Sequence, residues 1–189
     1  MHVRTLVRGF TAALAATFAL AGGQAAAAPA APVAEDRALA PRILTYDASA
    51  AAEFRAAVDR GAAIWNESVD AVELRPVAAG QRANIRILAD NGWPRAYTYS
   101  LGNGIVYIGR QAVDQGYNTV RISSHELGHI LGLPDRKPGP CSSLMSGSSA
   151  GIACTNPYPN AAEKAEVEND FGGTFAWPAG VPRNVMTVD

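Results

Sequence analysis

Two histidines and a glutamate lie close together in the string HELGH, at His125, Glu126 and His129. The chain has 189 residues but only three histidines, and the remaining one is His2. On a helix, residues four positions apart lie on one face, so the two imidazoles can direct nitrogen atoms at one point. This geometry suits a tetrahedral Zn²⁺ ion, which binds imidazole nitrogens at about 2.0–2.1 Å.

A catalytic zinc site usually has three protein ligands and a water molecule, so the two histidines need a third partner. No histidine follows them, which leaves a carboxylate. Gly132 can end the helix in a left-handed conformation and Pro134 prevents its continuation, so the chain can fold back toward the metal. The sequence therefore predicts His125, His129 and Asp135 as the zinc ligands.

Glu126 lies about 100° round the helix from His125, beside the metal rather than on it. Bound zinc lowers the pKa of its water ligand to about 7, and a neighbouring carboxylate can accept the proton and pass it to a leaving amine. The pattern favours a hydrolase with Glu126 as catalytic base. The alternative is a non-catalytic secreted zinc-binding module, which would have no need of Glu126.

Apolar periodicity places this motif on a helix and surrounds it with short strands. The predicted strands are Ile43–Tyr46, Val72–Leu74, Ile85–Leu88, Tyr97–Leu101 and Ile105–Ile108. The predicted helices run from Asp47 or Ser49 to about Trp65, from about Val120 to Leu131, and from Asn160 to Asp170. Asn160 and Glu163 are spaced as a capping box. The order of these elements indicates one α+β domain without internal repeats.

The first residues have the composition of a secretory signal peptide. Arg4 and Arg8 precede an apolar run over residues 10–21, and small residues follow up to Ala28. The run is too short to span a membrane, so we expect a secreted, extracellular protein. We divide the chain into a signal peptide over 1–28, a short pro-segment or linker over 29–41, the domain over 42–171 and an irregular C-terminal tail over 172–189.

Charge and cysteine content limit the partners. The chain has 16 Lys and Arg against 17 Asp and Glu and no basic run, which argues against binding to nucleic acid or to an acidic membrane surface. We expect a monomer whose partners are protein or peptide substrates. Cys141 and Cys154 are the only two cysteines, and an even pair in a secreted chain predicts a disulfide bond.

The residues His125 to Asp135, followed by the turn Leu144–Gly147, resemble the zinc motif and Met-turn of metzincins. With aspartate as third ligand, they are similar to the snapalysin family of small secreted neutral proteases. The similarity extends to GPCSSLMSG, CTNPYPNA and TYDASAAAEFRAAVDRGAAIWN. It implies a metzincin-like zincin fold, with a twisted mixed sheet packed on the active-site helix, a Met-turn and a C-terminal helix. It also implies endopeptidase activity that prefers an aromatic residue after the scissile bond.

The same resemblance assigns further roles. Met145 would be a hydrophobic floor beneath the zinc ligands. The pocket beyond the zinc is expected between the helix face near Ile122 and the loop Leu144–Ser149, with room for a large ring. An edge strand beside the cleft would add an extended peptide substrate through its free backbone groups. Its expected residues are Tyr97, Thr98, Tyr99 and Ser100.

Some features depart from the family pattern or leave an alternative open. Lys137 stands where the family commonly has a tyrosine and is a candidate to stabilise the oxyanion. The stretch Asn118–Val120 matches the family's calcium site but is poorer in hard oxygen ligands, so Ca²⁺ stays an open question. A thermolysin-like site would take its third ligand from Glu163, Glu166 or Glu168, which the spacing of Gly132 and Asp135 disfavours.

Overall fold

The computed structural model describes residues 40–173 and 185–188. The predicted signal peptide over 1–28 and most of the predicted pro-segment over 29–41 lie outside the described residues. Among the helices within the described ranges, none combines the length and the apolar content needed to cross a bilayer.

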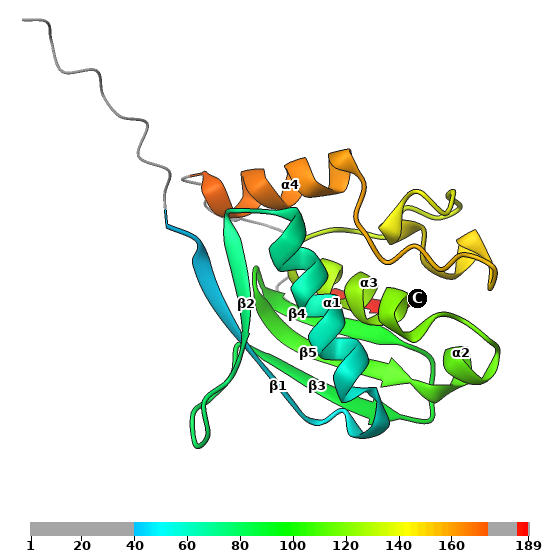
Figure 1. Cartoon of the computed structure of the whole chain (residues 1–189), viewed down its shortest axis with the longest axis horizontal. Coiled ribbons are helices and arrows are strands. Elements are labelled where there is room, and N and C mark those ends of the chain that lie inside the picture. Colours follow the sequence, from blue (N-terminus) through cyan, green and yellow to red (C-terminus); the bar gives the residue numbers. More distant parts are fainter. Residues whose placement is uncertain (1–39, 174–184, 189) are drawn as a thin grey trace, which may run out of the picture. The chain divides into compact units, whose positions relative to one another are not determined.

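The described residues form a six-stranded mixed sheet with strand order β2-β1-β3-β5-β4-β6 (Figure 1). The strands are β1 (Arg42–Ala50), β2 (Val72–Pro76), β3 (Ile85–Asp90), β4 (Arg95–Ser100), β5 (Asn103–Gly109) and β6 (Val185–Val188). β1, β2, β3 and β5 are parallel, whereas β4 is antiparallel to both β5 and β6. The five predicted strands correspond to β1–β5, which confirms the α+β fold with a mixed sheet. β6 falls in the tail expected to be irregular, so that expectation is wrong for residues 185–188.

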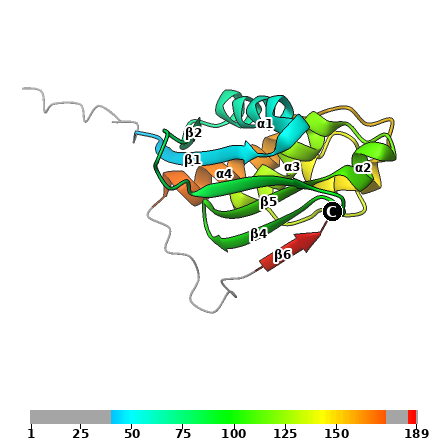
Figure 2. The same ribbon diagram turned by 90° about the horizontal axis from the view of Figure 1, so that it is seen from below.

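Helices α1 and α3 pack against each other and against the sheet, α1 on β2 and α3 on β4 and β5 (Figures 1 and 2). They cross closely at Gly61, where a Cβ atom would lie 3.0 Å from the Ser124 nitrogen. Trp65 Nε1–H donates to the Ser124 carbonyl at 2.8 Å. The described helices are α1 (Arg55–Ser68), α2 (Arg110–Asp114), α3 (Thr119–Ile130) and α4 (Ala161–Gly172), with 3-10 turns η1 (Ala52–Phe54) and η2 (Leu144–Ala150).

The first helix begins later than the sequence suggested. Asp47 and Ser49, the expected caps, belong to β1, because this part of β1 pairs with β3. The Asp47 carboxylate instead accepts a hydrogen bond from the Ser49 nitrogen at 2.9 Å, within the strand's irregular end. α1 starts at Arg55, after η1, and still includes the predicted Trp65.

The helix that carries the HELGH string is α3, within one residue of its predicted bounds. Asn118 caps its start by accepting a hydrogen bond from the Arg121 nitrogen at 2.9 Å. Every residue from Arg121 to Ile130 is buried, because α1, the sheet and the loop after α3 surround the helix. The site therefore rests on a rigid element. The largest fully buried side chains are Leu44, Ile64, Trp65, Ile85, Ile87, Ile108, Leu127, Ile130, Leu131, Leu133, Leu144 and Met145.

Candidate metal centre

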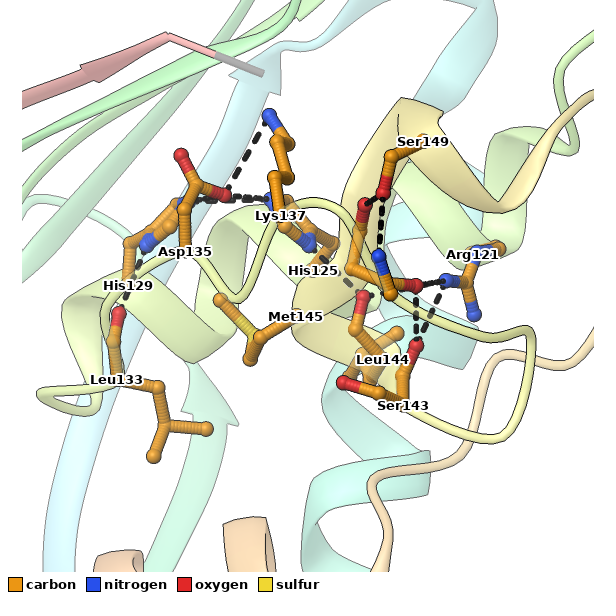
Figure 3. A network of polar contacts seen from close by, with 12 residues as sticks. Arg121, His125, His129, Leu133, Asp135, Lys137, Ser143, Leu144, Met145 and Ser149 are labelled. Atoms are coloured by element: carbon orange, nitrogen blue, oxygen red, sulfur yellow. Dashed lines mark hydrogen bonds and ion pairs between the residues drawn. The ribbon is translucent and has the colours of Figure 1, made fainter.

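Three side chains meet at one point beside α3 (Figure 3). The Nε2 atoms of His125 and His129 are 3.1 Å apart, and Asp135 Oδ1 lies 3.3 Å from the first and 3.5 Å from the second. A tetrahedral zinc ion with bonds of about 2.0–2.1 Å has ligand atoms about 3.3 Å apart. The three atoms therefore have the spacing of one face of that tetrahedron. Within the described ranges no other His, Cys, Asp or Glu group is clustered in this way.

The histidine rings are oriented by backbone carbonyls. Nδ1–H of His125 donates to the Leu144 carbonyl at 3.0 Å, and Nδ1–H of His129 donates to the Leu133 carbonyl at 2.8 Å. A carbonyl can only accept, so both rings carry their proton on Nδ1 and present the Nε2 lone pair to the common point. Such contacts fix the tautomer and rotation of metal-binding histidines.

Asp135 reaches the histidines because the chain reverses after α3. Gly132 has φ +105°, the left-handed conformation that its position in the sequence predicted. A Cβ atom there would also lie 2.6 Å from Asp170 Oδ2. The Arg136 nitrogen then donates to the Met145 carbonyl at 2.7 Å, which ties the returning chain to η2.

The surroundings of Asp135 favour its ionised form. Burial alone would raise the pKa of Asp135, but its polar contact with His125 and the positive charge of Lys137 help to hold it below the usual range. Lys137 Nζ lies 3.5 Å from Asp135 Oδ1, and Figure 3 shows its side chain extending toward the site. The carboxylate is thus in the charge state that a metal ligand requires.

Met145 lies below the two histidines in the view of Figure 3 and is completely buried. It can approach α3 because residue 128 is a glycine, whose absent Cβ would lie 2.8 Å from Met145 Sδ. This is the location that the resemblance gives to the hydrophobic floor. The sequence alone did not predict this role of Gly128, since a glycine inside a helix does not indicate which side chain packs on it.

A buried glutamate from α4 holds the turn that contains Met145. Glu163 accepts hydrogen bonds from Ser143 Oγ at 2.6 Å and from the Leu144 and Met145 nitrogens at 3.1 and 3.0 Å. It also accepts from the Asn160 nitrogen at 2.7 Å, which completes the predicted capping box. Burial alone would raise the pKa of Glu163, but these four hydrogen bonds lower it.

These contacts also decide against a thermolysin-like third ligand. The Glu163 carboxylate is directed at η2, Glu166 pairs with Arg136, and Glu168 accepts from the Asp70 nitrogen. Asp135 is the carboxylate that joins the two histidines.

The loop between α3 and α4 has two more anchors. Cys141 and Cys154 form the predicted disulfide bond. Arg121, 5 % exposed, donates to the Ser143 carbonyl at 2.9 Å and to Ser146 Oγ at 3.0 Å. This role of Arg121 could not be predicted from the sequence, because an arginine on a helix is usually solvated.

Glu126 lies on α3 next to His125 and is 0 % exposed. Asn118, part of the stretch considered for calcium, uses its side-chain oxygen to cap α3.

The predicted edge strand is part of β4 and lies against the metal helix. Thr98 Oγ1–H donates to the His129 carbonyl at 3.1 Å. β4 is not outermost in the sheet, however, since β6 pairs with its other side (Figure 2). The expectation that Tyr97–Ser100 has free backbone groups is therefore wrong for the residues of β4 that face β6.

A small pocket opens beside His125. Tyr117, Ile122, Gly147 and Ser148 contribute to its walls, in agreement with the expected position next to Ile122 and η2. Its internal volume is about 10 Å³, enough for about one water molecule. The Tyr117 hydroxyl is 3.5 Å from the Ser148 carbonyl across this pocket. A cavity of this size does not hold the large ring expected there, and Tyr117 is one of its walls.

The site combines a helix with HExxH spacing, a carboxylate on the returning chain and a turn with a buried methionine. This combination is typical of zinc-dependent hydrolases. The chain belongs to the Streptomyces extracellular neutral proteinase (M7) family, whose profile matches residues 42–173.

Two relatives that are similar in sequence agree with this membership. The chain is 44 % identical over 126 residues to the "Extracellular small neutral protease" of Streptomyces caespitosus, covering 66 % of this chain and 92 % of that protein. It is 40 % identical over 149 residues to the protein of the same name from Streptomyces sp. (strain C5), covering 76 % of this chain and 65 % of that protein. The crystal structure of archaemetzincin from Methanopyrus kandleri is similar with a TM-score of 0.43 and 13 % identity, over 71 % of this chain and 97 % of that one.

Proposed function

We propose that this chain is a secreted zinc endopeptidase that hydrolyses peptide bonds with Glu126 as general base. The observation that carries the proposal is the set of three ligand atoms, 3.1 to 3.5 Å apart, two of which come from histidines on the helix that also carries Glu126. Membership of an extracellular proteinase family supports it. We further propose that it acts as a monomer, which light scattering of the secreted protein would test.

Bound at the three ligands, Zn²⁺ would polarise the substrate carbonyl and lower the pKa of a water molecule to about 7. The protein's part is to hold His125 and His129 in one tautomer and Asp135 in its ionised form. Glu126 accepts the proton of the attacking water and transfers it to the leaving amine.

The experiment is casein hydrolysis by Glu126→Gln, which keeps the side-chain shape but cannot accept a proton. We expect wild-type zinc content and a loss of nearly all turnover, since general-base catalysis alone contributes about 10²–10⁴-fold. Glu166→Gln, the same replacement at a partly exposed position on α4, should retain full activity. Wild-type turnover by Glu126→Gln would refute the mechanism, and a zinc-loaded wild-type protein without activity would favour the non-catalytic zinc-binding module.

We also propose that the pocket beside His125 accepts an aromatic residue after the scissile bond, once Tyr117 moves away. Its ring is held by an edge-on contact with Trp93, at 5.8 Å between centroids, and by the long 3.5 Å contact of its hydroxyl. We expect Tyr117→Ala to raise the ratio of kcat/KM for substrates with an aromatic residue after the scissile bond to kcat/KM for substrates with a small residue there. Tyr158→Ala, at an exposed tyrosine outside this pocket, should leave the ratio unchanged. A cleavage-site profile without aromatic enrichment would contradict the pocket assignment.

A further inference from the structure

β6 continues the sheet beyond the part of the chain that the family shares. The family match ends at residue 173, whereas β6 covers Val185–Val188 and pairs with β4 in antiparallel register (Figure 2). The paired residues are Arg95 with Val188, Ala96 with Thr187, Tyr97 with Met186, and Thr98 with Val185. β5 pairs with the other side of the same β4 residues. In the described part of the chain, β4 is thus covered on both sides.

The edge that β6 covers is next to the metal ligands. Thr98, the partner of Val185, donates its hydroxyl to the carbonyl of His129. Just after β4, the Gly102 nitrogen donates to the Ile130 carbonyl at 2.9 Å, so the strand and the metal helix are joined at two points. A peptide bound along this side of β4 would therefore pass beside the zinc site.

We propose that Val185–Val188 is an internal competitive inhibitor that occupies the β4 edge in place of an extended peptide substrate. This inference rests on the proposed function, because only a peptidase whose substrate pairs with β4 would be inhibited in this way. Both occupants would use the same backbone N–H and C=O groups, so they exclude each other.

The sequence of the segment suits this role. Val-Met-Thr-Val is rich in β-branched residues, which favour extended strands. Pairing through the backbone does not demand particular side chains, so a segment of the same chain can replace many different substrates. Because β6 is covalently attached, its effective concentration at the β4 edge is on the order of millimolar, and a substrate must compete with it. The inhibition is therefore expected to act on KM rather than on kcat.

The first test compares the full chain with a variant that ends after Gly173. We expect KM for a protein substrate to fall at least about threefold in the shortened chain, with kcat unchanged. The synthetic peptide NVMTVD, residues 184–189, should raise KM of the shortened chain again at about millimolar concentration. Equal KM values in the two chains would overturn the inference alone, whereas absence of peptide hydrolysis in both would overturn the proposed function with it.

A second test keeps the chain at full length. Along a strand, successive N–H groups point to opposite sides, so of Met186 and Thr187 only one donates to β4. Met186→Pro and Thr187→Pro each remove one N–H, and only the one that faces β4 should lower KM. Amide hydrogen exchange supplies a readout independent of activity: the same variant should lose protection at alternate β4 amides. If neither variant changes KM or β4 protection, β6 does not occupy the substrate edge and the proposal is wrong.

Discussion

Replacement of Glu163 by glutamine should destabilise the protein strongly, although the side chain lies on α4 and does not contact the zinc ligands directly. Its Oε1 accepts from Ser143 Oγ and the Met145 nitrogen, and its Oε2 accepts from the Leu144 and Asn160 nitrogens. Glutamine has a single carbonyl oxygen. The amide nitrogen of glutamine would face two donors, and it cannot accept a hydrogen bond from either of them.

The expected size of the effect follows from this geometry. Two donors lose their acceptor, and each buried unsatisfied donor costs about 1–3 kcal/mol, so the free energy of unfolding should fall by about 2–6 kcal/mol. Typical domains have only about 5–15 kcal/mol in total. The zinc affinity should fall as well, because the Leu144 carbonyl orients the ring of His125.

The effect should depend on pH with a definite sign. The folded pKa of Glu163 is lowered from its ordinary value of 4.5. A lowered folded pKa means that the carboxylate contributes its full stabilisation above about pH 4.5 and loses it as the pH falls through the folded value. The stability difference between wild type and Glu163→Gln should therefore be largest at neutral pH and shrink in acid.

The assay is denaturant unfolding of both proteins between pH 7 and pH 3. The control is Glu166→Gln on the same helix, whose partly exposed ion pair with Arg136 should contribute about 0–1 kcal/mol. If Glu163→Gln costs no more than Glu166→Gln at pH 7, or if its cost is the same at pH 3, the anchoring role assigned to Glu163 is refuted.

Two further predictions concern the loop over the metal. Lys137→Met should lower kcat by about 100-fold at unchanged zinc content, because the ammonium beside Asp135 can stabilise negative charge on the attacked carbonyl. Lys164→Met on α4 is the control, and an unchanged kcat for Lys137→Met would contradict this role. Replacing Cys141 and Cys154 together by serine should lower the free energy of unfolding by about 3 kcal/mol in the chain-entropy account of a loop this short. Denaturant unfolding measures that loss, and a value near zero would show that the disulfide does not support the loop.

The features that the sequence determined are local in the chain. The positions of His125 and His129 on one helical face follow from helical periodicity, and the reversal that presents Asp135 follows from Gly132. Both depend on residues within one or two turns of each other. The five strands β1–β5 were recognisable for the same reason, as short apolar segments between turn residues.

Other features required the tertiary structure, because they join residues far apart in sequence whose types have an ordinary local explanation. Glu163 fits a capping box, yet it also holds η2, and Gly61 is a plain helix glycine until α3 packs against it. β6 shows this most clearly. Four residues of a tail rich in glycine and proline have no partner nearby in sequence, so their strand exists only through hydrogen bonds to β4. The sequence thus determined the candidate metal ligands and their helix, while long-range contacts decided what anchors the turn around Met145 and which strand covers the β4 edge.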